Sequence, residues 1–249
     1  MEFYLISLMS KKIKKAKLFN KKSINELKNE IKNEKFNRIT LSFYKYTNIK
    51  DPKLFRDKLF IKLDSLNVLG RIYISLEGIN AQISVPEHLY KKFKIILLSY
   101  DFIKTSDIKE AIQEGISFYK LTIKVRKELV AYGVQKDTYD MNKVGEHLNA
   151  LDYNNAIDDK DSVIVDMRNY YESEIGKFNN AIIPNVETSK ELLPEVKKIL
   201  KGKEKKNILL YCTGGIRCEK ASSYLIKNGF EKVKQLKGGI IQYAHEVKE

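Results

Sequence analysis

Residues 211–222 read YCTGGIRCEKAS and contain both cysteines of the chain together with two adjacent glycines. The segment follows a short apolar run and leads into a pattern typical of a helix. Such runs alternate with helical patterns throughout the second half of the chain, at SVIVD (162–166), AII (181–183), NILLY (207–211) and VKQL (233–236). This alternation predicts a mostly parallel α/β sheet, with Cys212 just beyond the carboxyl end of a strand.

The loop that follows this strand has the composition of a thiolate cradle. Its two glycines tolerate the positive φ that turns backbone N–H groups inward. The helix that begins near Arg217 adds its positive end, and the guanidinium adds a full charge. We therefore predict a lowered pKa for Cys212 and catalytic roles for Cys212 and Arg217, with a buried, unreactive Cys212 as the alternative. The predicted active-site loop consists of Thr213, Gly214, Gly215 and Ile216.

The second cysteine, Cys218, falls in the first turn of the predicted helix. A packing role and a role as the resolving thiol for Cys212 fit this position equally well. Two cysteines so close together cannot form a disulfide framework, which is consistent with a reducing compartment.

The first half of the chain has a different pattern. Strand-like and helix-like runs follow the order β-α-β-β-α-β, which is the split βαβ arrangement of ferredoxin-like folds. It predicts an antiparallel sheet backed by two helices. The strands are predicted at 38–46, 70–78, 80–85 and 116–127, and the helices at 51–66 and 86–100. Ahead of them, Ser23 and Glu26 have the spacing of a capping box for a short basic helix.

Charge is distributed unevenly along the chain. The formal net charge is +14; residues 150–249 hold 17 basic and 15 acidic side chains, or +2, so residues 1–149 carry the other +12. A basic surface attracts polyanions, and aromatic residues suit base stacking, so RNA is the predicted partner. Forty lysines against six arginines also fit a genome-wide codon bias, which is the alternative. The aromatic candidates are Phe43, Tyr44, Tyr46 and Tyr73.

Several kinds of site lack support in the sequence. The histidines at 88, 147 and 245 have no ligand-like partners at i+3 or i+4, so no metal site is predicted. No nucleotide, nicotinamide or flavin motif occurs, so no cofactor is predicted. The apolar runs are too short to span a bilayer and the first residues lack a signal-peptide pattern. We therefore expect a cytoplasmic protein with no membrane partner, and no protein partner is predicted.

Three segments of the second half together resemble a rhodanese domain: residues 211–222, VIVDMRNYYESEIGKFNNAIIPNV (163–186) and LKGGI (236–240). The resemblance implies that Cys212 can act as a nucleophile and carry a persulfide. Four residues separate Cys212 from Arg217, whereas phosphatase-like relatives use five, so phosphatase and arsenate reductase activities are disfavoured. The residues that match the upstream signature are Asp166, Arg168 and Glu172. We expect these three to act structurally, through sheet-end hydrogen bonds and helix capping.

The chain also resembles, over about residues 36–245, the bacterial family of rhodanese-containing tRNA uridine hydroxylases. The segments that carry this resemblance are GRIYISLEGINAQISVP (70–86), KVRKELVAYG (124–133) and YCTGGIRCEKAS (211–222). It implies oxygen-dependent 5-hydroxylation of the wobble uridine at tRNA position 34, with Cys212 as the active-site thiol. The implied partners are the tRNA anticodon loop and molecular oxygen as co-substrate. The candidate contacts to tRNA phosphates are Arg71, Arg126 and Lys127. The alternative is that these three residues are surface charges with no role in binding.

The resemblance also sets the expected domain organisation. Residues 1–35 are predicted as a basic N-terminal helical extension, 36–135 as a ferredoxin-like (acylphosphatase-like) domain, and 145–249 as a rhodanese domain. Members of the family usually continue into a further cysteine-containing tail, whereas this sequence stops at Glu249. We therefore expect a reduced version, a truncated one, or one with weakened activity.

Three functions remain open at this point. In the first, an ionised and accessible Cys212 adds to C6 of the uracil ring and makes C5 electron-rich enough to meet an oxidant. In the second, the protein is a sulfurtransferase that carries a persulfide on Cys212. In the third, it is an RNA-binding module without catalysis.

Overall fold

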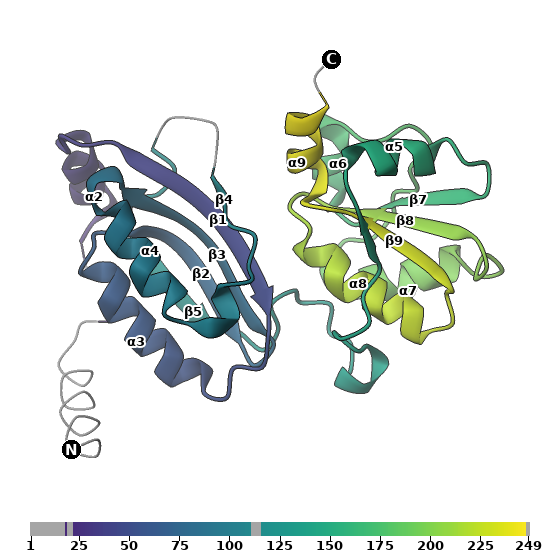
Figure 1. The fold of residues 1–249 in the computed structure, drawn as a ribbon, viewed down its shortest axis with the longest axis horizontal. Coiled ribbons are helices and arrows are strands. Elements are labelled where there is room, and N and C mark those ends of the chain that lie inside the picture. The colour runs from purple at the N-terminus through teal and green to yellow at the C-terminus, as the bar shows by residue number, and fades with distance from the viewer. Residues whose placement is uncertain (1–17, 19–21, 111–115, 248–249) are drawn as a thin grey trace. The chain divides into compact units, whose positions relative to one another are not determined.

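The computed structural model describes residues 18, 22–110 and 116–247 (Figure 1). Its contacts divide the chain into two compact units that meet between Leu129 and Val130. Each unit has its own sheet and its own core. Within the described residues, no helix is both long and apolar enough to cross a membrane.

Helix α2 (Ile24–Lys32) lies in the described part of the predicted basic extension. It begins with the predicted capping box, in which the Ser23 and Glu26 side chains bind each other's backbone N–H groups. Residues 1–17 and 19–21 of the extension lie outside the described residues.

The first unit is built on a five-stranded sheet in the order β4-β1-β3-β2-β5. Its strands are β1 (Arg38–Tyr46), β2 (Leu69–Ser75), β3 (Gly78–Pro86), β4 (Lys109–Glu110) and β5 (Leu121–Val125). Helices α3 (Pro52–Asp64) and α4 (Tyr90–Leu98) cover one face of the sheet (Figure 1). Alternation along the strands puts Ile72, Ile79 and Ile83 into the core beneath these helices, where each is 0% exposed.

The last strand departs from the predicted all-antiparallel sheet. β5 pairs in parallel with β2, and the free edge of β1 is closed by β4, a short strand that the sequence pattern did not reveal. Burial accounts for this placement: α3 packs against β5, and Leu121 and Ile123 of β5 are only 6% and 5% exposed. The strand extends the surface on which α3 rests.

The second unit is built on a parallel sheet in the order β6-β9-β8-β7. Its strands are β6 (Glu146–Leu148), β7 (Ser162–Asp166), β8 (Asn207–Tyr211) and β9 (Lys232–Leu236). Its helices are α5 (Ala150–Ile157), α6 (Tyr170–Ile175), α7 (Ser189–Ile199), α8 (Ile216–Lys227) and α9 (Gly239–Glu246). The short 3₁₀ turns among the described residues of both units are η1 (Glu87–Leu89), η2 (Asp101–Ile103) and η3 (Lys136–Thr138).

Strand β8 is buried on both faces and fixes the position of the loop that follows it. Ile208 and Leu210 pack into a core shared with α7 and α8, whereas Leu209 and Tyr211 pack into a second core with α5 and α9. The continuous apolar run therefore reads as a central parallel strand, as predicted. The strand predicted at 181–183 is reduced to one isolated bridge, Val165 with Ile182.

Candidate active site

Cys212 lies directly beyond the carboxyl end of β8, in a turn that leads into α8. The backbone N–H of Gly215 donates to the Cys212 sulfur at 3.1 Å. Gly215 has a φ of 101°, in the region that favours glycine, so a side chain at this position would strain the turn that aims the N–H group. The backbone N–H of Cys218, one turn into the helix, donates to the Gly215 carbonyl at 3.0 Å and also helps to lower the pKa of the Cys212 thiol. These two amides form the cradle.

The cradle favours the thiolate form of Cys212. Burial of the thiol raises its pKa, but four contributions together outweigh that effect and lower the pKa to about 6. They are the Cys218 thiol as a hydrogen-bond donor, the charge of Arg217, and the N–H groups of Cys218 and Gly215. Because the pKa is lowered, the thiolate predominates above about pH 6.

Cys218 is the partner that supplies the thiol donor. It is 0% exposed, and burial, followed by its hydrogen bond to Cys212, raises its pKa well above the usual value. In this arrangement it stays protonated and donates. A resolving role requires a nucleophilic sulfur, which this burial disfavours, so that role stays a prediction.

Arg217 acts on the thiol from a position fixed by Glu172. The guanidinium donates Nη1 to Glu172 Oε2 at 2.9 Å and Nη2 to Oε1 at 3.0 Å. The Thr213 hydroxyl donates to the same carboxylate. Burial raises the pKa of Glu172, but the hydrogen bonds from Arg217, Thr213 and the Asn169 backbone outweigh it and lower the pKa to about 2. Arg217 therefore lowers the pKa of Cys212 through its charge, while its guanidinium is hydrogen-bonded to Glu172.

The three signature residues upstream have the structural roles predicted for them. Asp166, 0% exposed at the end of β7, accepts from Arg168 Nη2 at 2.7 Å and from the Tyr211 hydroxyl at 2.7 Å. Glu172 closes a capping box with Asn169 at the start of α6. Its bond to Arg217 was not predicted, because the two residues are far apart in sequence.

Two further residues that support the loop were not identified from the sequence. Tyr132, 1% exposed, donates its hydroxyl to the Arg217 carbonyl at 3.2 Å. At Gly239, whose φ is 70°, a Cβ atom would lie 2.5 Å from the carbonyl oxygens of both Cys212 and Thr213. The next N–H, of Ile240, donates to the Cys212 carbonyl at 2.8 Å. The sequence feature that could have pointed to Gly239 and Ile240 is the motif LKGGI (236–240), which contains both residues.

Two expectations about the loop need correction. Only Gly215 of the glycine pair has a positive φ; Gly214 does not, and a Cβ placed on Gly214 meets nothing within 4 Å. Cys212 is 0% exposed, so it is not the accessible thiol that was expected. Because the sulfur is buried, a substrate reaches it only if residues around it move.

The predicted site residues fall into two groups. Thr213, Gly214 and Gly215 form the turn, and Ile216 and Arg217 begin α8, next to Cys212 and Cys218. The candidate phosphate contacts lie in the other unit, where they are exposed: Arg71 on β2, and Arg126 and Lys127 just after β5. Of the predicted stacking residues, Phe43 is 3% exposed and belongs to the core, so it is not available to a base.

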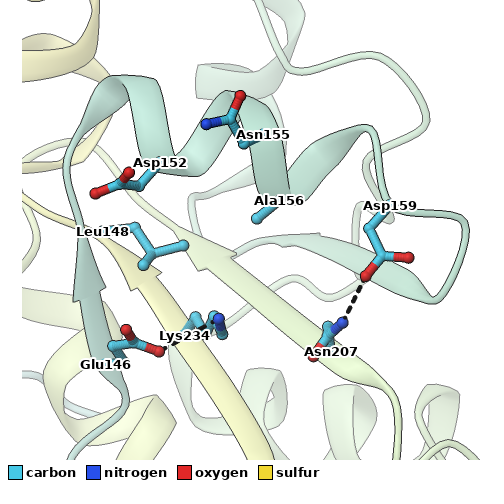
Figure 2. Close-up of a pocket in the computed structure, with 8 residues that line it drawn as sticks. All are labelled: Glu146, Leu148, Asp152, Asn155, Ala156, Asp159, Asn207 and Lys234. Atoms are coloured by element: carbon cyan, nitrogen blue, oxygen red, sulfur yellow. Dashed lines mark hydrogen bonds and ion pairs between the residues drawn. The ribbon is translucent and has the colours of Figure 1, made fainter.

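A surface hollow of about 470 Å³ lies elsewhere on the second unit (Figure 2). Its lining includes Asn207 at the start of β8, the end opposite to Cys212, and Asp159, which accepts from Asn207 at 2.9 Å. Glu146 in the same lining pairs with Lys234 at 3.3 Å. Four of its polar residues thus form two pairs with one another, and none of the lining residues belongs to the thiol site.

The state of Cys212 gives a testable pH dependence. Alkylation of Cys212 by iodoacetamide should rise with pH about a midpoint near 6, because the thiolate is the reacting form. Trypsin cuts after Arg217, so Cys212 and Cys218 fall on separate peptides and can be followed separately by mass spectrometry. Cys218 serves as the internal control and should not react in this range. A Cys212 midpoint of 8 or above would contradict the cradle.

The fold and the thiol site define a protein with an acylphosphatase-like domain followed by a rhodanese-like domain. The UPF0176 acylphosphatase like domain matches residues 38–129, and the Rhodanese-like domain matches residues 149–246. The predicted fold class is thereby confirmed. Among solved structures, a rhodanese-related protein from Thermoplasma volcanium has a TM-score of 0.35 and 27% identity, and the similarity covers 42% of this chain and 95% of that one.

Sequence relatives narrow the class to a family. A protein of Leptospira interrogans named tRNA uridine(34) hydroxylase is 46% identical over 237 residues, which are 95% of this chain and 65% of that protein. One of the same name from Yersinia enterocolitica is 46% identical over 236 residues, 93% of this chain and 67% of its own length. The chain belongs to the family whose curated members are named tRNA uridine(34) hydroxylase, as predicted. It spans about two thirds of the length of these relatives.

Proposed function

We propose that this protein hydroxylates C5 of the wobble uridine at position 34 of tRNA, with Cys212 as the active-site thiol. The observation that carries the proposal is the Cys212 sulfur at the end of a central strand, which accepts from the Gly215 N–H at 3.1 Å and whose surroundings lower its pKa to about 6. The name shared by the relatives supports the substrate and the reaction. An anticodon-loop base is unpaired, so an enzyme reaches it without opening a duplex.

The chemistry assigned to Cys212 is activation of the uracil ring. Its thiolate adds to C6, and the electron pair of the C5–C6 double bond moves to C5, which then bonds to molecular oxygen. One oxygen atom stays on C5 as the hydroxyl. The other leaves as water, with two electrons from a reductant such as a small thiol and two protons from solvent. Loss of the C5 proton and departure of the Cys212 sulfur from C6 restore the double bond.

The proposal is tested on tRNA from bacterial cells that lack the family gene. Expression of this chain should restore 5-hydroxyuridine at position 34, measured by mass spectrometry of digested tRNA, and an empty vector should not. No change in the nucleoside would overturn the proposal and favour an RNA-binding protein without catalysis.

Sulfur transfer is the second candidate, because the rhodanese-like domain and the thiolate cradle both suit a persulfide. Incubation with thiosulfate and cyanide separates the two functions. Rapid thiocyanate formation without altered tRNA would favour sulfur transfer, and slow formation with altered tRNA favours hydroxylation.

A further inference from the structure

A row of polar and aromatic side chains crosses the sheet of the first unit. The strand register places Tyr44 of β1 and Tyr73 of β2 on either side of Asn80 of β3, and pairs Lys124 of β5 with Tyr73. The next row, which includes Phe43 and Ile72, points into the core under α3 and α4 (Figure 1). Because side chains alternate along a strand, the row with the tyrosines lies on the opposite face.

The side chains of this row reach solvent. Tyr44, Tyr73 and Asn80 are partly exposed and Lys124 is exposed. Neighbouring strands are about 4.8 Å apart, so the two tyrosines are anchored about 10 Å from each other with Asn80 between them. The asparagine amide offers a donor and an acceptor between the two rings.

Positive charge surrounds the same row. The Arg126 guanidinium carbon lies 5.1 Å from the centroid of the Tyr73 ring, a cation–π distance that stiffens both side chains. Arg71, exposed on the same face, lies two residues before Tyr73 on β2. Residues 1–149 carry +12 of the formal charge of +14. A ligand suited to this face has flat rings and a polyanionic backbone.

We propose that the Tyr44–Asn80–Tyr73–Lys124 row is a docking platform for unpaired RNA bases, with one base stacked on each tyrosine. The choice of RNA rests on the proposed function. Single-stranded nucleic acid offers base faces to aromatic side chains, whereas a duplex hides them. Lys124, Arg126 and Arg71 bind the phosphates between the stacked bases. This platform holds unpaired nucleotides of the substrate RNA.

The test measures RNA affinity of the full chain by fluorescence anisotropy at one fixed salt concentration. The probes are a labelled, uridine-rich single strand and a labelled RNA duplex of equal length. Tyr44→Ala and Tyr73→Ala should each weaken single-strand binding by about fivefold or more, the effect expected for losing one stacked base, and leave duplex binding unchanged. Tyr73→Phe should bind as the wild type does, because it keeps the ring.

Control variants separate the platform from general charge and surface effects. Lys124→Ala should weaken binding of both probes, whereas Lys92→Ala, an exposed lysine on α4, should have a smaller effect. Ile95→Ala, 73% exposed on the same helix, should have none. Single-strand binding that is absent in the wild type or unchanged in both tyrosine variants would overturn the proposal. If binding depends on the tyrosines but no 5-hydroxyuridine forms in tRNA, the proposed function is wrong and the platform is supported. If 5-hydroxyuridine forms but binding does not depend on the tyrosines, only the platform is wrong.

Discussion

Replacing Cys212 with serine is expected to abolish 5-hydroxyuridine at position 34 in cells that depend on this chain, a loss of roughly a thousandfold or more. A serine hydroxyl does not ionise near neutral pH, so the two backbone N–H groups of the cradle have no anion to stabilise. The side chain that should add to C6 is then inert. Mass spectrometry of the digested tRNA measures the effect.

Cys218→Ser is the matched control, because it makes the same chemical change at a neighbouring residue that is also 0% exposed. Serine still donates a hydrogen bond to the Cys212 sulfur, so most activity should remain. Normal 5-hydroxyuridine in the Cys212→Ser strain would show that the thiol has no part in the chemistry.

Glu172→Ala is expected to cause the second large effect, on both stability and reactivity. It leaves the Arg217 guanidinium and the Thr213 hydroxyl without their shared acceptor. The side chains of Arg217 and Glu172 are only 24% and 19% exposed, so losing the pair should cost about 2–3 kcal/mol of the unfolding free energy, observed as a drop of several degrees in melting temperature. The pKa of Cys212 should rise as Arg217 becomes free to move.

The pH dependence of this loss follows from the pKa of Glu172. Because the folded-state pKa is lowered to about 2, the carboxylate contributes stability above its ordinary pKa of 4.5, and that contribution disappears as the pH falls from 4.5 towards 2. The melting temperatures of wild type and Glu172→Ala should therefore converge over that range. Glu174→Ala, an exposed acidic residue on the same helix, is the control and should shift melting little at any pH. Parallel melting curves for Glu172→Ala and wild type between pH 7 and 3 would contradict the role given to this carboxylate.

The local features of the thiol site were predictable because a few neighbouring residues determine them. An apolar run with no polar interruption gives a central strand, and Gly215 gives a turn that only glycine adopts without strain, so Cys212 had to follow a strand and face backbone N–H groups. From the sequence, a buried Cys212 was only the alternative to an accessible thiol, because burial depends on contacts with other segments of the fold. Tyr132, for example, belongs to the same buried core cluster as Cys212.

Contacts between residues far apart in the chain could not be predicted from the sequence. Glu172 and Arg217 lie on different helices, and nothing in the spacing of either residue indicates their ion pair. The position of β5 is a similar case, because an alternating apolar pattern predicts a strand but not its neighbour. Phe43 and Tyr44 show the same limit: both looked available to a base, and the register of β1 buries one and leaves the other partly exposed.

The most direct test of the central claim follows heavy-isotope dioxygen into tRNA with purified protein, a reductant and tRNA bearing uridine at position 34. The wild-type chain should place one heavy oxygen atom on C5 of that uridine, and the Cys212→Ser protein should place none. Equal labelling by both proteins, or a product whose new oxygen comes from water, would contradict the claim that the Cys212 thiolate prepares the base for molecular oxygen.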